Sequence, residues 1–332
     1  MNRSRTKTES VEALRKLLRG GGAAVAPMAG ITDRSFRRIC RRMGSIYVTT
    51  ELLSSEGWSR GGARTERMAA FSEEERPLGI QLFGSNPSSM AESARRAGEL
   101  SPDFIDINFG CPVKKVVRSG GGSACMKDLP LMREIVSAVN EATELPVSMK
   151  IRAGWDEQHL NAPEAAGLAE EEGLAFVTVH GRSRTQFFQG RANLEIIRET
   201  KQAVSLPVVG NGDVVDADSY EAMIEKTGVD AVLVGRGCIG NPWVFQEIEA
   251  RRQGRNWNAP LLEERVELIL EHLSAKVENL GERRGVVEFR KQIAWYLKGF
   301  PGASALRKGV FSQSDHAGIR ETLLAFLRED TS

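Results

Sequence analysis

The chain has 332 residues, of which 41% are hydrophobic, 27% charged and 6% aromatic, and this composition excludes a disordered or fibrous protein. No apolar run approaches the roughly 18 residues of a membrane span, and the first twenty residues are basic, so the expected location is the cytoplasm. The cysteines form no CxxC pair, which argues against a zinc site and a disulfide framework.

The formal net charge of +1 hides an uneven distribution of charge. Residues 1–45 carry a net charge of +8 and residues 283–308 carry +6, whereas the rest of the chain carries −13. Two basic segments on an acidic body suggest a polyanionic partner. For either segment alone, a solvated helix face is an equally good explanation.

Eight short apolar runs have the pattern of buried parallel strands. They cover residues 23–27, 46–50, 79–83, 104–108, 147–151, 176–180, 208–211 and 231–235. Expected helices between them cover residues 33–43, 87–100, 129–143, 163–172, 194–203 and 216–227. This alternation predicts an α/β protein with a (β/α)8 TIM barrel, and a doubly wound sheet is the structural alternative.

The chain beyond residue 242 has no convincing strand and two helical apolar stripes. The stripes are Leu262, Val266, Ile269, Leu273, Val277 and Leu280, and then Val286, Phe289, Ile293, Leu297 and Phe300. We therefore expect three parts: an N-terminal basic segment over residues 1–20, a catalytic barrel over 21–250 and a small all-helical domain over 251–332.

Polar residues at the carboxyl ends of the strands are the first candidates for a site, because barrel enzymes build their active sites there. Strand alternation turns the following side chains inward: Asp106, Asn108, Ser148, Lys150, Arg152, Thr178 and His180. A buried lysine is costly without a partner, so Lys150 is predicted to bind a ligand, with an internal ion pair to Asp106 as the alternative.

Glycine-bearing turns follow the last two expected strands, at residues 211–213 and 235–237. Loops at these places in a TIM barrel commonly bind phosphate, and a simple tight turn is the alternative. Residues 235–240 also read GxGxxG, but a dinucleotide fingerprint should precede further strands, and none is expected here.

Cys111 lies just past the fourth strand, between Gly110 and Pro112, and is a candidate nucleophile or general acid. Cys40 and Cys238 are expected to be buried apolar residues, whereas the pattern around Cys125 favours neither role. His180 is predicted to hydrogen-bond a ligand. A metal site is not expected, because the chain has no HxH, HxxxH or HExxH pair.

Five segments together resemble the signatures of the tRNA-dihydrouridine synthases, most closely those of the DusB-like bacterial branch. They are residues 26–33 (APMAGITD), 106–115 (DINFGCPVKK), 150–155 (KIRAGW), 180–184 (HGRSR) and 211–213 (NGD). The resemblance spans about residues 20–310. It implies an enzyme with bound FMN that reduces particular uridines of tRNA to 5,6-dihydrouridine with NADPH, or NADH, as reductant.

The resemblance also implies roles for individual residues. Pro27, Met28 and Ala29 would lie against the flavin, Gln81, Lys150 and His180 would bond its ring, and Asn211, Gly212, Asp213, Gly235 and Arg236 would hold its ribityl phosphate end. Asn108, Arg182 and Arg184 would contact the tRNA, and Cys111 would donate a proton. The glycine-rich segment 119–126, with Cys125, departs from the expected pattern.

The chemistry of uracil defines what Cys111 would have to do. The C4 carbonyl makes the C5–C6 double bond a conjugate acceptor, so hydride is expected at C6 and a proton from Cys111 at C5. Cations such as Lys150 would lower the pKa of the thiol and oppose this role.

A stacked uracil must also be flipped out of the RNA, whose phosphates the protein must grip. A first candidate is the arginine stripe of the 33–43 helix, at Arg34, Arg37, Arg38, Arg41 and Arg42. A second is the C-terminal set Arg290, Lys291, Lys298, Arg307 and Lys308, beside Trp295 and Tyr296, which could equally be core aromatics.

Two other functions stay open from the residues alone. One is a flavin barrel enzyme for a free pyrimidine or other small metabolite, and the other is a catalytically silent RNA-binding protein. No membrane association and no obligate protein partner are expected. The sequence leaves open the uridine positions, the choice between NADPH and NADH, and the oligomeric state.

Overall fold

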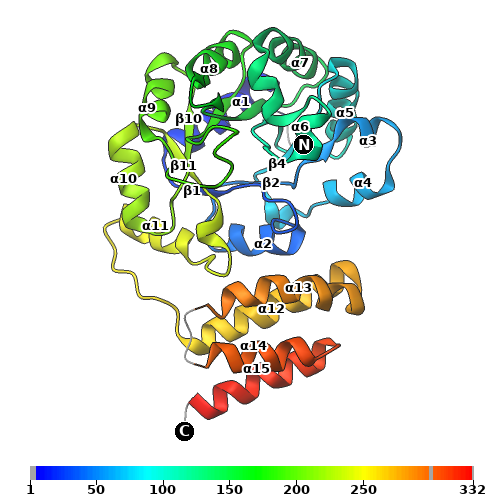
Figure 1. The fold of residues 1–332 in the computed structure, drawn as a ribbon, viewed down its shortest axis with the longest axis vertical. Coiled ribbons are helices and arrows are strands. Elements are labelled where there is room, and N and C mark those ends of the chain that lie inside the picture. Colours follow the sequence, from blue (N-terminus) through cyan, green and yellow to red (C-terminus); the bar gives the residue numbers. More distant parts are fainter. Residues whose placement is uncertain (1–4, 299–301, 331–332) are drawn as a thin grey trace.

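The computed structural model describes residues 5–298 and 302–330, and a ring of parallel strands forms its core (Figure 1). The ring consists of β1 (Ala23–Val25), β2 (Val48–Thr49), β4 (Leu78–Phe83), β5 (Phe104–Phe109), β6 (Val147–Arg152), β9 (Phe176–His180), β10 (Val208–Asn211) and β11 (Ala231–Val234). The strands pair in the order β1-β11-β10-β9-β6-β5-β4-β2, and the N–H of Ile46 donates to the carbonyl of Ala23 at 2.9 Å, which links the two ends. This order confirms the (β/α)8 barrel and excludes the doubly wound sheet.

Helices cover the outside of this ring, as expected for parallel strands whose outward side chains are apolar. They are α2 (Arg34–Arg42), α5 (Pro87–Glu99), α7 (Leu129–Glu141), α8 (Ala162–Glu171), α9 (Leu194–Ala203), α10 (Ala217–Thr227) and α11 (Val244–Arg252). The eight predicted strands and six predicted helices are therefore confirmed, with small differences at their ends.

Short elements that the sequence pattern did not predict follow several strands at their carboxyl ends. They are β3 (Leu53–Ser54), α3 (Ser55–Ser59), α4 (Ala63–Ala69), η1 (Glu73–Glu75), α6 (Lys114–Arg118), η2 (Gly122–Lys127), the hairpin of β7 (Gly154–Asp156) and β8 (His159–Leu160), and η3 (Arg236–Cys238). Except for η1, which comes just before β4, these elements follow the carboxyl ends of strands and therefore build the mouth of the barrel.

The N-terminal basic segment contains a helix, α1 (Lys7–Arg19), that covers the opposite end of the barrel. Its Leu14 and Leu18 pack on Tyr47, Phe104 and Phe176, which lie at or just before the starts of their strands. Two basic side chains of α1 also attach the helix to the barrel, because Lys7 and Arg15 donate hydrogen bonds to backbone carbonyls there. Residues 1–4 lie outside the described residues.

The C-terminal part is helical, as predicted, and consists of α12 (Leu262–Leu280), α13 (Glu282–Tyr296), α14 (Ala303–Ser312) and α15 (His316–Asp330). Figure 1 shows α12 and α13 next to the barrel and α14 and α15 beyond them. The His272 ring of α12 stacks on Phe36 of α2 with centroids 5.5 Å apart, which joins the two parts. Phe300 of the second predicted stripe lies outside the described residues. None of the described helices has the length and apolar composition that a membrane crossing requires.

Candidate active site at the barrel mouth

The inward side chains predicted from strand alternation meet inside the barrel. Gln81 lies opposite Asp106 in the strand register, and Asp106 lies opposite Ser148. The Asp106 carboxylate accepts hydrogen bonds from the Gln81 amide at 2.6 Å and the Ser148 hydroxyl at 2.7 Å. Burial raises the pKa of Asp106, although these two donors and Lys150 act to lower it. This polar layer forms the floor beneath the mouth.

Lys150 lies one layer above Asp106, and it does not form the internal ion pair with Asp106 that the sequence left open. Its ammonium group donates to the side-chain oxygen of Asn211 at 3.0 Å. Burial and the charge of Arg152 lower its pKa to about 7, against the weaker opposing effect of Asp106. A half-buried ammonium group with a lowered pKa is suited to a further hydrogen-bond acceptor or anion in the mouth.

Asn108 positions the loop that carries Cys111. Its side-chain oxygen accepts from the backbone N–H of Cys111 at 2.8 Å and of Gly110 at 3.1 Å, and its amide nitrogen donates to Gln81 at 2.8 Å. Asn108 is buried, so these bonds use most of its capacity. The predicted contact between Asn108 and tRNA stays untested, and the geometry favours a positioning role.

The glycine-rich segment after Cys111 folds back over it. Gly122 has φ +58°, and a Cβ there would approach the Cys111 carbonyl oxygen to 2.8 Å. The backbone N–H and the hydroxyl of Ser123 both donate to that same carbonyl. The Cys125 thiol is buried and bonds the carbonyl of Gly120 at 3.3 Å, so Cys125 holds the segment in place. Gly122 therefore allows the segment to pack closely against Cys111.

The Cys111 thiol keeps its proton at neutral pH. Burial raises its pKa above the ordinary value, although the Val113 backbone N–H and the charges of Arg152 and Lys150 act to lower it. The nearby cations were expected to lower the pKa of the thiol, but the opposite effect of burial is larger. Cys40 and Cys238 are fully buried, as expected.

His180 is a neutral imidazole in this environment. Burial and the surrounding cations, Lys150 first among them, lower its pKa well below the ordinary value. In the strand register, His180 of β9 lies opposite Asn211 of β10 on one side and opposite Arg152 of β6 on the other. A neutral ring that donates or accepts one hydrogen bond fits the predicted ligand contact.

The turn after β10 is held in place by a buried arginine. Gly212 has φ +140°, and a Cβ there would approach Ala192 to 2.5 Å, so the turn requires glycine. The Asp213 carboxylate accepts from Arg182 at 2.7 Å and from the Ala192 N–H at 2.7 Å. Arg182 is only 2% exposed and also donates to the Gln189 and Gly190 carbonyls. These contacts favour Arg182 as a positioning residue, and its predicted contact with RNA stays untested.

The chemistry of the mouth fits the flavin that the resemblance implies. Pro27 lines the small cavity beside Lys150, and Met28 is half-buried while Ala29 is exposed next to it. A Cβ added to Gly235 would meet only Ala26, at 4.0 Å, and the neighbouring Arg236 side chain is largely exposed. Pro27 and Met28 offer an apolar surface for a flat ring, and the polar side chains of the mouth can donate hydrogen bonds to the carbonyl groups of that ring. The open turn at Gly235, with the Arg236 cation, suits a phosphate group at the other end of the ligand.

Arg184 does not point freely into the mouth. Its guanidinium lies 4.5 Å from the centroid of the Trp155 ring, which Lys127 also approaches at 4.9 Å. Its contact with tRNA therefore stays a prediction. The sequence pattern missed the exposed Phe187 and Phe188 in the same loop, and their adjacency in a loop was the signal that could have identified them.

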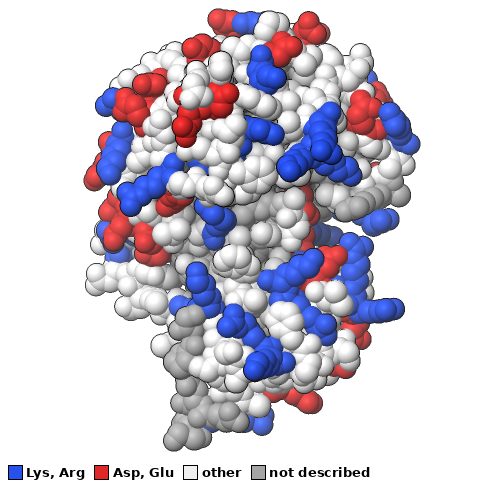
Figure 2. Space-filling view, viewed as in Figure 1, with Lys and Arg blue, Asp and Glu red and all other residues white. Residues whose placement is uncertain are grey.

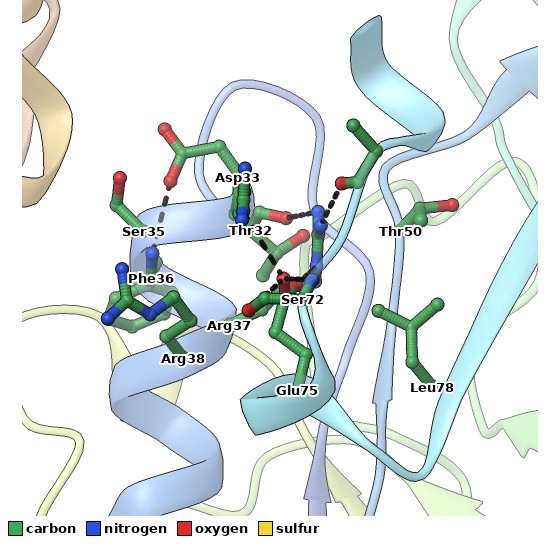
Figure 3. A network of polar contacts seen from close by, with 12 residues as sticks. Thr32, Asp33, Ser35, Phe36, Arg37, Arg38, Thr50, Ser72, Glu75 and Leu78 are labelled. Atoms are coloured by element: carbon green, nitrogen blue, oxygen red, sulfur yellow. Dashed lines mark hydrogen bonds and ion pairs between the residues drawn. The ribbon is translucent and has the colours of Figure 1, made fainter. Parts of the chain in front are cut away.

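The arginine stripe on α2 is not a free basic surface. Arg37 is buried and bonds Glu75 at 2.7 Å and the Thr32 carbonyl at 3.1 Å, as Figure 3 shows. Arg38 pairs with Glu74 at 2.6 Å, and Arg42 makes two bonds to Glu271 of α12. The predicted role of this stripe in RNA binding stays untested, and the carboxylate partners of Arg37, Arg38 and Arg42 favour a structural role.

Arg34 and Arg41 complete the stripe and are engaged in the same way. Arg34 lies 3.7 Å from the buried Glu75 carboxylate, and Arg41 donates to the carbonyls of Arg76 and Ser45. The stripe thus binds α2 to η1, to neighbouring loops and to α12.

The C-terminal basic set is more accessible. Figure 2 shows Lys and Arg side chains gathered over the helical part on the face in view. Lys291 and Lys298 are exposed and have no ion pair with any described residue, whereas Arg290 donates to the Gln313 carbonyl. Trp295 is 45% exposed, but Tyr296 is buried and bonds His272 at 3.0 Å. Only Trp295 of the two aromatics is therefore available for stacking.

Comparison with known proteins gives one family. The family model described as dihydrouridine synthase (Dus) matches residues 24–331. A tRNA-dihydrouridine synthase B of Pseudomonas aeruginosa is 42% identical over 284 residues, which cover 85% of this chain and 86% of that one. A probable tRNA-dihydrouridine synthase of Rickettsia bellii is 37% identical over 304 residues, or 91% of this chain and 93% of its own.

Among solved structures, a 6-hydroxypseudooxynicotine amine oxidase of Pseudomonas geniculata matches with a TM-score of 0.50 and 15% identity. The match covers 76% of this chain and 47% of that one. At this identity the likeness concerns the fold alone.

Proposed function

The chain belongs to the dihydrouridine synthase family, and we propose that it reduces specific uridines of tRNA to 5,6-dihydrouridine with bound FMN and with NADPH as reductant. The close relatives are named for this activity on tRNA. We expect it to act in the cytoplasm, where its substrate is modified.

One observation carries the proposal: a protonated thiol lies in the same barrel mouth as an inward, half-buried lysine. Asn108, which bonds the Cys111 backbone, lies opposite Lys150 in the strand register. The charges of Lys150 and Arg152 act on the thiol, yet burial keeps its pKa raised. Reduction of a uracil double bond needs an acid that retains its proton until charge develops on the ring. Cys111 meets this requirement.

Each polar residue of the mouth then has a defined task. When bound, the flavin would supply a hydride to C6 of the uracil. Cys111 would give its proton to C5, while Lys150 and Gln81 would orient the ring system through hydrogen bonds. Neutral His180 would contribute one further hydrogen bond. Asn211, Gly212, Asp213, Gly235 and Arg236 would hold the ribityl phosphate end.

RNA binding is assigned to the helical part. The exposed Lys291 of α13 and Lys298, in the turn just after that helix, would pair with phosphates, together with Arg290, which precedes Lys291 on α13. The contacts between α2 and α12 would keep this surface at a fixed position relative to the mouth. Such a fixed position would determine which uridine reaches Cys111.

Nucleoside mass spectrometry of tRNA tests the proposal. A strain without the gene should lose dihydrouridine at one or more positions, and a plasmid copy should restore it. Purified protein should reduce tRNA but not free uridine, which separates this function from that of a small-metabolite enzyme. Unchanged dihydrouridine in the deletion strain at every mapped position would contradict the proposal.

A further inference from the structure

Two exposed phenylalanines stand on the loop between β9 and α9, over residues 181–193. Phe187 is 38% exposed and Phe188 is 48% exposed. Their rings meet edge to face, with centroids 5.3 Å apart and planes at 88°. Phe187 has φ +55°, a conformation that is costly for a bulky residue. Strain of this kind persists only where the surrounding structure enforces it.

Buried arginines enforce the conformation of this loop from below. Arg152 donates to the carbonyl of Ser183 at 2.7 Å and to that of Phe187 at 2.8 Å. Arg182 donates to the next carbonyls along the loop, at Gln189 and Gly190. The turn is thus fixed on one side by charged donors, while its aromatic rings remain exposed on the other. Packing of the core does not require this arrangement.

Phe188 lies close to arginines that contact the two parts of the proposed site, the Cys111 loop and the turn after β11. Its ring centroid lies 5.6 Å from the Arg152 guanidinium and 5.8 Å from that of Arg236. Arg152 also donates to the carbonyl of Gly110, the residue before Cys111, at 2.8 Å. Arg236 begins the turn after β11. Phe188 therefore lies at the rim between the Cys111 loop and the predicted phosphate turn.

We propose that Phe188, supported by Phe187, is a stacking platform for an RNA base that neighbours the target uridine. The inference rests on the proposed function. An exposed aromatic face beside an exposed guanidinium matches a base on a phosphate backbone. When one nucleotide enters the mouth, its neighbour in the chain stays at the rim, where Phe188 lies.

The alternative ligand of the same chemistry is the dinucleotide reductant. Its nicotinamide must reach the bottom of the mouth to exchange a hydride, so its reacting ring would lie deeper than Phe188. The rim position therefore favours RNA.

The experiment uses the flavin-loaded protein and three variants. Phe188→Leu removes the aromatic face but keeps an apolar side chain, and Phe188→Tyr keeps the face. Leu100→Ala is the matched control, because Leu100 is also exposed but ends α5 at the opposite end of the barrel. Dissociation constants are measured for unmodified tRNA carrying an abasic site on the 5′ or the 3′ side of the target uridine, and for intact tRNA. Flavin reduction by NADPH is measured without tRNA.

Phe188→Leu should weaken the binding of intact tRNA about five- to tenfold, the lower end for stacking of one base. Phe188→Tyr and Leu100→Ala should bind like the wild type. With one of the two abasic tRNAs, wild type and Phe188→Leu should bind equally, since the stacked base is gone. Flavin reduction should be the same in all four proteins.

Two results would overturn the inference. Equal affinity of wild type and Phe188→Leu for intact tRNA would show that the rings are not a platform. Slower flavin reduction in Phe188→Leu with unchanged tRNA affinity would assign the ring to the reductant. Dihydrouridine formation by the wild type is followed in parallel, so a failure of the proposed function would appear there as an absence of product.

Discussion

The side-chain oxygen of Asn108 accepts a hydrogen bond of 2.8 Å from the backbone N–H of Cys111. The same oxygen accepts from Gly110, so the peptide that precedes Cys111 is fixed to the end of β5. The Cys111 carbonyl is held from the other side by Ser123. The backbone of Cys111 is thus fixed at both of its polar atoms, while its thiol carries none of these bonds.

Substitution of Cys111 by alanine should therefore leave the loop and the bound flavin in place. Turnover on tRNA should fall by about 10² to 10⁴, the usual contribution of a general acid. The measurement combines flavin absorbance of the purified variant with the rate of tRNA reduction. Flavin reduction by NADPH serves as the control and should stay normal. Near-normal turnover would exclude Cys111 as the proton donor.

Lys150 offers a separate test of the cofactor site, because among the described residues its ammonium group donates a hydrogen bond only to Asn211. Lys150→Met should lower the amount of FMN that survives purification, since it removes a charged donor to the ring. The matched control is Lys201→Met, which removes a lysine paired with Asp230 outside the mouth. Full FMN occupancy in Lys150→Met would contradict the assignment.

The depressed pKa of Lys150 also predicts how stability varies with pH. The pKa of this group is about 7 in the folded chain and about 10.4 in the unfolded chain, so between these pH values the unfolded chain binds more protons. The free energy of unfolding of flavin-free protein should therefore gain about 1 kcal/mol from Lys150 between pH 7.5 and 8.5. Denaturant unfolding of wild type and Lys150→Met at both pH values isolates this gain. Identical pH dependence in the two proteins would show that folding does not lower the pKa of Lys150.

The C-terminal cations should dominate the salt dependence of tRNA binding. Lys291→Ala combined with Lys298→Ala removes two phosphate contacts, so the slope of log affinity against log salt should become shallower by about 1.4 to 1.8. Adding Arg290→Ala should change the slope less, since the Arg290 guanidinium already donates to the Gln313 carbonyl. Arg133→Ala with Arg251→Ala removes two barrel cations that are already paired and should leave the slope unchanged. An unaltered slope in the lysine variant would make that surface a solvated helix face.

Local patterns predicted the barrel and the inward residues well, because strand alternation depends on neighbouring residues alone. Asn108, Lys150 and His180 could be placed at the mouth in this way. The helical spacing of the α2 arginines was equally clear, yet it did not indicate their role. Their partners Glu75 and Glu271 lie 38 and 229 residues away in the sequence from Arg37 and Arg42, so only the folded chain brings them together.

The rim of the mouth could not be predicted for a related reason. The orientation of Phe188 depends on Arg152, an inward strand residue, and on the conformation that Arg152 imposes on Phe187. Loop conformations that rest on such long-range bonds leave no periodic signal in the sequence.

The most direct test of the whole account is dihydrouridine formation by the purified protein. Flavin-loaded wild type and Cys111→Ala are incubated with NADPH and tRNA from a strain that lacks the gene, and the nucleosides are quantified by mass spectrometry. The account predicts that dihydrouridine accumulates with the wild type, at least about 10²-fold faster than with Cys111→Ala. Absence of dihydrouridine with wild type that carries its flavin and oxidises NADPH would contradict it.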